Sequence, residues 1–485
     1  MMTGLDIRPV LYVIGALVSV IAVAMLLPMA TDIYYGNADW QVFAAASAIT
    51  LFFGVLLMLT NRVEQLTLSL RQTFILTTLS WVVICAFSAA PFMVSSLKLS
   101  PADAYFEAMS GLTTTGSTVI SGLDNLAPGL LLWRSILNCL GGVGIIALGI
   151  AILPFLRVGG MQLFRSESSD RSDKVTPRAS DLAIELLWVY FMLTAACAVC
   201  LSFAGMSTFD AINNAMATIA TGGFSTRDAS IGGWNNPAVE WVIIVFMTAG
   251  GIPLVRFVSI THGDFTPIWR DSQVRWFVGF MAVASIGLAL WINDVYAESP
   301  HDALRHAAFN VVSIVTTTGF ASTDYSVWGH LPVVAFLILT MVGGCTGSTS
   351  GGIKIFRFEI LFMVLRVQIN RLFMPHRVVP LSYNNKQVDA DAMVSVMSFG
   401  FVYIASIFIV ALGLGAFGLD LVTSVSGAAT ALGNVGPGLG AVIGPAGNFA
   451  TLPDGAKWVL SAAMLLGRLE FFTVLVLLNR AFWRQ

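Results

Sequence analysis

Long apolar runs, separated by short polar segments, occupy most of the 485 residues of the chain. Each run is close to or longer than the roughly 20 residues that a helix needs to cross the hydrocarbon layer of a membrane. The pattern predicts ten membrane-spanning helices, at about residues 10–30, 41–60, 72–95, 130–156, 181–204, 237–260, 276–293, 331–372, 392–414 and 456–483.

Composition supports an integral membrane protein, because 56% of the residues are hydrophobic and only 11% are charged. An ordinary soluble domain has roughly 25% charged residues, and its core could not bury this much apolar surface. The surroundings of the chain are therefore membrane lipid, and the net charge of -2 gives no indication of a nucleic-acid partner. Cys197 and Cys200 form a C-x-x-C pair in an apolar run without His or further Cys residues, which favours packed thiols over metal ligands.

The positions of Lys and Arg predict the orientation of the spans, because these residues concentrate in cytoplasmic loops. Most of them fall on the side that holds the N-terminus, including clusters at 165–178 and 366–386. An even number of spans returns the chain to that side. We therefore expect a multi-pass protein with both termini in the cytoplasm.

Four outward loops share a pattern that the inward loops lack: an acidic start, a helix-compatible stretch and a turn that contains glycine. These loops run from Asp103 to Gly116, from Asp210 to Gly223, from Asp302 to Gly319 and from Asp420 to Gly436. They are too short to span and too apolar for solvated connections, so we expect four re-entrant loops. Backbone of this kind survives at membrane depth only where protein or a water-filled cavity satisfies its polar groups.

The repeated turns suggest a filter for cations. An Asp at each start is a plausible N-cap of a short helix, whose C-terminal end would then turn its partial negative charge into the membrane. Glycine lets backbone carbonyls point inward, and rings of such carbonyls can replace the hydration shell of an ion. An isolated turn of this type would be an ordinary surface turn, but four in register favour a filter. The candidate ion-binding residues are Thr114, Thr115, Gly116, Thr221, Gly222, Gly223, Thr317, Thr318, Gly319, Asn434, Val435 and Gly436.

The second turn has two adjacent glycines. Matching Gly223-Phe224 to Gly319-Phe320 makes Gly223, rather than Gly222, the equivalent of Gly116. The predicted fold is therefore all-α, with ten transmembrane helices and four re-entrant pore-helix loops in a pseudo-fourfold arrangement around one pore.

A glycine-rich stretch at 343–352 interrupts the eighth span, and each glycine costs a helix about 1 kcal/mol relative to alanine. An unwound loop that crosses the pathway as a gate fits this composition, and close helix packing through small residues is the alternative. The candidate gate residues are Gly343, Gly344, Thr346, Gly347, Ser348, Thr349, Gly351, Gly352 and Arg468. Arg468 lies in the middle of the last span, where a charge needs compensation. Loop carbonyls and hydroxyls could compensate it, or else nearby Glu470, and Lys354 could either snorkel or take part in gating.

On these residues the chain resembles the Trk, Ktr and HKT superfamily of potassium and sodium transporters, and most closely its TrkH-type bacterial potassium-uptake subunits. The resemblance implies four repeats of helix, pore helix and helix, and a gating loop in contact with Arg468. It also implies potassium as the transported ion, because glycine rather than serine occupies position 116. No other cofactor is expected.

The resemblance further implies a homodimer in the bacterial inner membrane and a cytosolic nucleotide-binding partner of the TrkA type. The chain has no predicted Rossmann segment of its own, in which G-x-G-x-x-G follows a strand and opens a helix. The basic loops 165–178 and 366–386 could dock such a partner or could be topology signals alone. We expect two leading helices at 1–65, followed by pore repeats at 66–165, 175–265, 270–380 and 388–485.

Other classes of protein explain the sequence less well. A secondary carrier with a midplane site would have inverted repeats, whereas these repeats share one orientation. A membrane anchor for a complex would not need four filter turns. An enzyme is not expected, because the five histidines, at 262, 301, 306, 330 and 376, lie in or beside loops. Sodium- or proton-coupled symport would use the same filter, so the sequence leaves it open beside passive flux.

Overall fold

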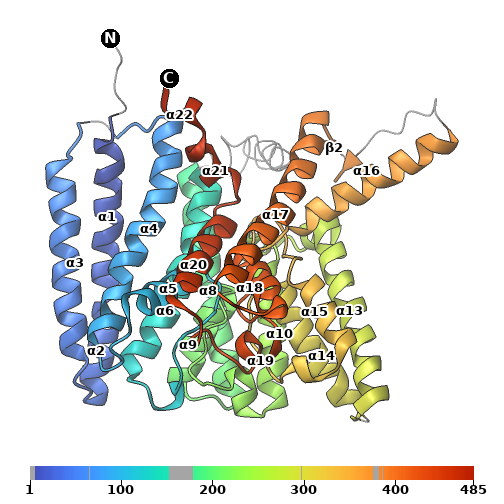
Figure 1. Ribbon diagram of the computed structural model, residues 1–485, viewed down its shortest axis with the longest axis horizontal. Coiled ribbons are helices and arrows are strands. Elements are labelled where there is room, and N and C mark those ends of the chain that lie inside the picture. The colour runs from blue at the N-terminus through green and yellow to red at the C-terminus, as the bar shows by residue number, and fades with distance from the viewer. Residues whose placement is uncertain are drawn as a thin grey trace.

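The computed structural model describes residues 6–64, 66–151, 179–296, 298–374, 382–384 and 386–484. Helices make up almost all of this part of the chain, and Figure 1 shows them as a broad layer. The start of α1 and the whole of α22 lie at the same end of the molecule. Strands within it are limited to β1 (Ser382–Tyr383) and β2 (Lys386–Gln387), an antiparallel pair in which Ser382 faces Gln387. The predicted all-α class is therefore confirmed.

The two leading spans pack beside the first repeat, at one edge of the layer (Figure 1). They comprise α1 (Arg8–Ala24), α2 (Leu26–Tyr35) and α3 (Trp40–Thr60). Glycines bring α1 and α3 close together, because a Cβ atom on Gly15 would lie 2.7 Å from the carbonyl oxygen of Gly54. Small residues at a crossing point allow this kind of packing between membrane helices.

Each predicted repeat contains helices on either side of a short central helix. The first two repeats contain α4 (Leu70–Val94), α5 (Pro101–Leu112), α6 (Pro128–Ala151), α8 (Ala179–Phe203), α9 (Thr208–Ile219), α10 (Pro237–Gly251), α11 (Leu254–Thr261) and α12 (Thr266–Arg270). The other two contain α13 (Ser272–Tyr296), α14 (Pro300–Val315), α15 (His330–Leu339), α16 (Ile355–Phe373), α17 (Ala390–Ala416), α18 (Leu421–Gly433), α19 (Gly440–Ile443), α20 (Asp454–Arg468), α21 (Phe472–Leu478) and α22 (Arg480–Arg484). Short 3-10 turns follow three of the central helices, at Leu123–Asn125, Ser230–Trp234 and Tyr325–Val327.

The described residues include seven helices long and apolar enough to cross a membrane, or up to nine if each of two bent pairs counts as one span. The chain is therefore a multi-pass membrane protein, but three of the ten expected spans are not single straight helices. The span expected at 237–260 bends by 100° between α10 and α11, and the last span bends by 114° between α20 and α21. The eighth is divided into α15 and α16 by residues 340–354, where the glycine-rich sequence predicted an interruption.

Local chemistry explains the two bends. Gly250 and Gly251 weaken the end of α10, and Pro253 lacks the N–H that would continue it. At the end of α20, Glu470 and Phe471 have φ values of 60° and 52°, which a right-handed helix cannot contain.

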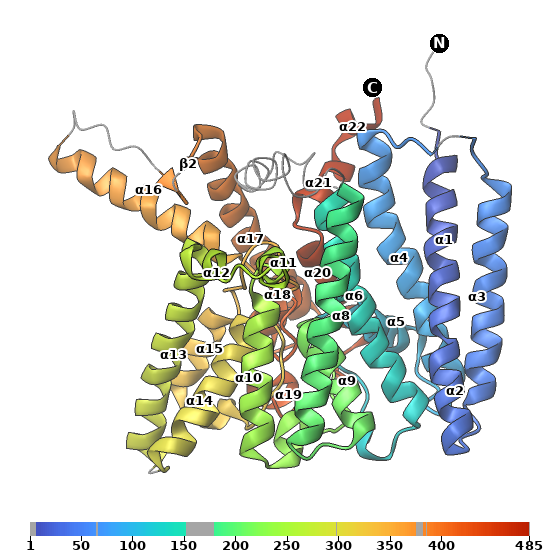
Figure 2. The same ribbon diagram turned by 180° about the vertical axis from the view of Figure 1, so that it is seen from behind.

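Figure 2 shows the layer from behind, with α16 projecting away from the other helices at the end that also holds α22. The parts of the predicted repeats at 152–165 and 375–380 lie outside the described residues, as do the whole basic cluster 165–178 and Arg377.

Candidate functional site

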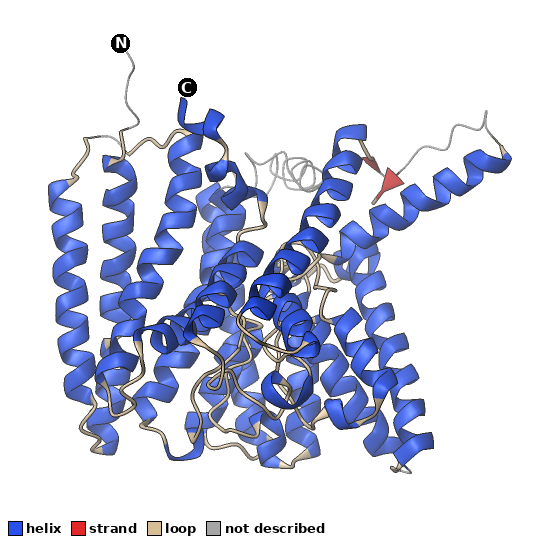
Figure 3. Cartoon of the chain, in the orientation of Figure 1, coloured by secondary structure: helices blue, strands red, loops and turns tan. Residues whose placement is uncertain are grey.

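Non-helical backbone gathers in the middle of the molecule, among the ends of the short helices α5, α9, α14 and α18 (Figure 3). Serine caps three of these helices, because the hydroxyl oxygens of Ser100, Ser207 and Ser299 each accept the backbone N–H three residues on, at 3.1–3.2 Å. The prediction that Asp is the N-cap is therefore wrong for three repeats and right only for Asp420. The other three Asp residues, at 103, 210 and 302, lie in the first turn of their helices.

These first-turn carboxylates still complement the positive end of each helix. Each accepts a hydrogen bond from the hydroxyl of its capping serine, at 2.7–2.8 Å. The bond from Ser299, together with Arg305, lowers the pKa of Asp302 below its ordinary value. A negative charge thus remains at the outer end of the helix while its carbonyl end points to the centre.

The four helices end with the same backbone hydrogen bonds. In each turn, the N–H of the residue just before the expected filter glycine donates to a carbonyl five residues earlier. These bonds are Thr115 to Ser110 (2.8 Å), Gly222 to Ala217 (2.8 Å), Thr318 to Ser313 (2.8 Å) and Val435 to Thr430 (3.0 Å). The repeat seen in the sequence is therefore also a repeat of conformation.

Backbone angles give the register of the four turns. Residues Thr114, Thr221, Thr317 and Asn434 have φ values of 52°, 51°, 57° and 53°. Two residues later, Gly116, Gly223, Gly319 and Gly436 have φ values of 87°, 70°, 81° and 115°, a region that favours glycine. This pattern pairs Gly223, not Gly222, with Gly116, as the sequence match suggested.

The turns contact one another in cyclic order. A Cβ atom on Gly116 would lie 2.6 Å from the carbonyl oxygen of Gly222, and one on Gly223 would lie 2.0 Å from that of Thr318. A Cβ on Gly319 would lie 1.9 Å from the Val435 oxygen, and one on Gly436 would lie 2.8 Å from the Thr115 oxygen. Each glycine thus faces the carbonyl of the residue before the next glycine. The structure brings together all twelve residues of the four turns, although their repeats are far apart in sequence.

Side chains close the seam between the first and last repeats. Ser117 donates its hydroxyl hydrogen to the carbonyl of Gly436 at 2.7 Å, and the amide of Asn434 donates to the hydroxyl of Thr115 at 3.0 Å. Thr113 and Thr115 share a hydroxyl hydrogen bond of 2.8 Å, which Thr316 and Thr318 repeat at the same length.

A buried ion pair supports the first two turns from behind. Arg134 Nε lies 2.8 Å from Glu107 Oε1, and the two side chains are 1% and 0% exposed. Arg134 Nη1 also donates to the carbonyl of Ser225, just beyond the second turn, while Glu107 Oε2 accepts the N–H of Val119, just beyond the first. The pair is absent from the site predicted from the sequence. The signal was present, because both charges fall within apolar segments.

Two further ion pairs join neighbouring repeats. Lys457 of α20 lies 2.5 Å from Asp103 of α5, and Arg305 of α14 lies 3.3 Å from Glu240 of α10. These contacts tie the short helices α5 and α14 to the longer helices α20 and α10 of neighbouring repeats.

The glycine-rich loop, residues 340–354, occupies the bend between α10 and α11. Its N–H groups at Cys345 and Thr349 donate to the carbonyls of Gly251 and Gly250, and its Gly347 carbonyl accepts the N–H of Leu254. The loop thereby provides hydrogen-bond partners for backbone groups that have none within a helix, because the chain bends between α10 and α11. The loop's own ends pair through a bridge between Val342 and Ile353.

Arg468 is 3% exposed and binds two carbonyls. Its Nη1 donates to Thr349 of the loop at 2.8 Å, and its Nη2 donates to Gly141 of α6 at 3.3 Å. Glu470, the alternative partner, instead pairs with Arg357 at the start of α16. Lys354 is also buried, and its Nζ donates to the Ser350 carbonyl within the loop.

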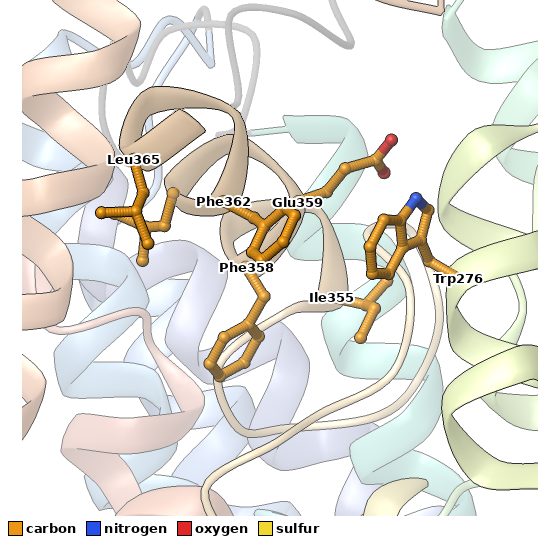
Figure 4. A pocket seen from close by; sticks show the side chains of 7 residues that line it. Trp276, Ile355, Phe358, Glu359, Phe362 and Leu365 are labelled. Atoms are coloured by element: carbon orange, nitrogen blue, oxygen red, sulfur yellow. The ribbon is translucent and has the colours of Figure 1, made fainter. Parts of the chain in front are cut away.

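A pocket of about 300 Å³ lies elsewhere, between α13 and α16 (Figure 4). Trp276 lines one wall and Phe358, Phe362 and Leu365 line the other, with Glu359 as the only acidic lining residue. Such walls do not suit a cation. Among the described residues there is also no group of three or more His, Cys, Asp or Glu side chains that could hold a metal ion, and Cys197 and Cys200 are free thiols.

Comparison with known proteins agrees with the geometry. Residues 39–484 match the model of the TrkH family, described as a cation transport protein. The chain belongs to the TrkH family.

Among curated members of the family, the Trk system potassium uptake protein TrkI of Halomonas elongata is 45% identical over 98% of this chain and 97% of its own length. The Trk system potassium uptake protein TrkH of Escherichia coli is 39% identical over 99% of each chain. The crystal structure of the potassium transporter TrkH from Vibrio parahaemolyticus superposes with a TM-score of 0.91 at 35% identity, covering 99% of this chain and all of that one. This TrkH-family chain is thus a transporter and not an enzyme.

Proposed function

We propose that this chain carries potassium into the bacterial cell along one pathway through the four turns. The observation that carries the proposal is the cyclic contact of the turns, in which each glycine faces a carbonyl of the next repeat. Four backbone segments with similar positive φ values form a ring of carbonyl oxygens, and such rings replace the hydration shell of an ion. Four helix C-termini directed at the ring favour a cation.

Potassium is the ion named for the curated relatives and for the similar crystal structure. Glycine at all four equivalent positions keeps the ring free of side chains that would alter its size. We assign the filter to Thr114, Thr115, Gly116, Thr221, Gly222, Gly223, Thr317, Thr318, Gly319, Asn434, Val435 and Gly436.

The loop 340–354 is the proposed gate. It fills the break between α10 and α11, and Arg468 holds its Thr349 carbonyl, so the loop has a defined closed position. Gly343, Gly344, Gly347, Gly351 and Gly352 allow this backbone to rearrange, and Thr346, Ser348 and Thr349 provide its polar contacts.

The remaining proposals concern the orientation of the chain, its membrane and its partners. The distribution of basic residues supports a cytoplasmic side that contains both termini, in the bacterial inner membrane. We also propose a homodimer and a TrkA-type nucleotide-binding partner on the cytoplasmic side, where the described part of the basic segment 366–386 belongs to α16 and the β1–β2 pair.

Substitution of Gly116 by Ser tests the filter. The added Cβ would lie 2.6 Å from the Gly222 oxygen, and φ is 87°, so the ring must shift. We expect a loss of about 5- to 150-fold in the preference for Rb⁺ over Na⁺ in proteoliposomes, because a strained site of this kind costs about 1–3 kcal/mol. Gly122→Ser is the matched control, since Gly122 has φ of 79° but nothing within 4 Å of its Cβ position.

An unchanged ion preference in a well-folded Gly116→Ser protein would remove the first turn from the filter. In the same vesicles, an imposed proton or sodium gradient separates symport from passive flux. Symport would drive Rb⁺ against its own gradient, whereas a passive pathway would only dissipate that gradient.

A further inference from the structure

The loop 340–354 touches the four turns unequally. In the second repeat, Thr221 donates to the hydroxyl of Thr349 at 3.3 Å, and Thr349 donates to the carbonyl of Ile219 at 2.9 Å. In the third repeat, the N–H of Gly351 donates to Thr317 Oγ1 at 2.7 Å. In the fourth, a Cβ on Gly351 would lie 2.4 Å from the Gly433 carbonyl oxygen, so the two backbones are in direct contact.

The first repeat is bridged differently. Thr114 has no hydrogen bond to the loop among the described residues. Its neighbour is Gly141, whose Cβ position lies 2.9 Å from Thr114 Cγ2 and whose carbonyl accepts a bond from Arg468. Three turns thus meet the loop directly, and the first meets it only through Arg468.

Thr317 differs from the other residues at its position in the turns. The hydroxyl oxygen of Thr317 accepts the backbone N–H of Gly351 in the loop, and both residues are buried. Gly351 N–H therefore depends on this oxygen, because a buried N–H without a partner is costly. The Thr317 hydroxyl also lies 3.3 Å from Ser350 Oγ, a second and weaker contact with the loop.

We propose that Thr317, one of the residues assigned to the filter, couples closure of the loop to ion binding at its hydroxyl oxygen, so that potassium bound there favours opening. The inference rests on the proposed function. A cation that approaches Thr317 Oγ1 meets the positive hydrogen of Gly351 N–H at the same oxygen, and the two repel each other. Ion binding at this position and the closed loop therefore oppose each other. By linkage, the closed loop weakens that ion position and the ion weakens closure to the same extent.

Cys345 provides a native reporter for the loop. It lies in the loop, is 0% exposed, and its backbone N–H binds the Gly251 carbonyl in the closed position. Opening of the loop would expose its thiol to a water-soluble maleimide. Mass spectrometry of the peptide that contains Cys345 measures the labelling rate without removal of the other four cysteines, of which Cys200 is exposed.

The experiment compares labelling of Cys345 in the full chain, reconstituted in proteoliposomes, in potassium and in choline. We expect potassium to accelerate labelling of the wild-type protein, and this measurement needs no variant. Thr317→Val removes the acceptor for Gly351 N–H and should raise the labelling rate in choline about tenfold, the effect of one unsatisfied buried N–H. It should also abolish the response to potassium. Thr317→Ser keeps the hydroxyl and should label like the wild type.

Thr114→Val is the matched control, because it makes the same change at the equivalent position of a turn that the loop does not bind. Its labelling rate in choline should equal that of the wild type, whatever its effect on flux or on the response to potassium. Equal acceleration in Thr114→Val and Thr317→Val, or labelling of the wild type that is insensitive to potassium, would overturn the coupling.

Rb⁺ and Na⁺ fluxes measured in the same vesicles separate this inference from the proposed function. Selective flux combined with labelling that responds to neither potassium nor Thr317→Val overturns the coupling alone. Absence of selective flux overturns both.

Discussion

Removal of Arg134 should destabilise the protein and loosen the first two turns together. The Glu107–Arg134 pair is almost completely buried, so Arg134→Met leaves a carboxylate without its cation in a site that water does not reach. Loss of one partner of a buried pair costs about 3–5 kcal/mol. The same change frees the Ser225 carbonyl next to the second turn. We therefore expect reduced Rb⁺ over Na⁺ selectivity as well as lower stability.

A double-mutant cycle in detergent measures the effect. SDS titration gives the free energy of unfolding for Glu107→Gln, for Arg134→Met and for the double variant. The double variant should lose at least about 1 kcal/mol less than the sum of the single losses, because the two residues share one interaction. Arg62→Met, at an exposed position, should change stability little. Additive losses, or single variants as stable as the wild type, would refute the assigned role of the pair.

Two further predictions concern the gate and the ring. Arg468→Ala and deletion of residues 346–350 should each raise Rb⁺ flux in proteoliposomes. Combining the two changes should add little, since Arg468 binds the loop at Thr349. Normal flux in both well-folded variants would rule out the loop as a gate. Gly319→Ala should lower the yield of folded protein more than Gly116→Ala does, because its Cβ would lie 1.9 Å rather than 2.6 Å from the next carbonyl oxygen; equal yields would argue against the ring contacts.

Long apolar runs and repeated turns could be predicted from the sequence because their signals are local. A span needs only an uninterrupted apolar run, and the match of Gly223 to Gly319 needed only the phenylalanine that follows each glycine. The backbone angles of the second turn agree with that match. The glycine-rich interruption of the eighth span was also predictable, because the composition of 343–352 is incompatible with a stable helix.

Other local signals were present but were interpreted wrongly. Three repeats begin with serine followed three residues later by aspartate, as at Ser100 and Asp103, which is the spacing of a capping box. The serine is the cap, because its short hydroxyl reaches the N–H three residues on. The break after α10 was likewise readable from Gly250, Gly251 and Pro253, but the apolar character of the segment favoured a continuous helix.

Contacts between distant residues could not be predicted from the sequence. Glu470 is next but one to Arg468, yet it pairs with Arg357 because the chain turns sharply after α20. The bond between Gly351 and Thr317 likewise depends on where the loop lies relative to the third turn. Such pairs are set by tertiary packing, and no local pattern specifies them.

Location of bound ions tests the central claim most directly. Thallium is a heavy analogue of potassium, and its anomalous scattering in crystals of this protein reports where the ion binds. The account predicts thallium density on the axis enclosed by Thr115, Gly222, Thr318 and Val435, whose carbonyl oxygens face the glycines of the neighbouring turns. Thallium density confined to other parts of the protein, with none between the four turns, would contradict it.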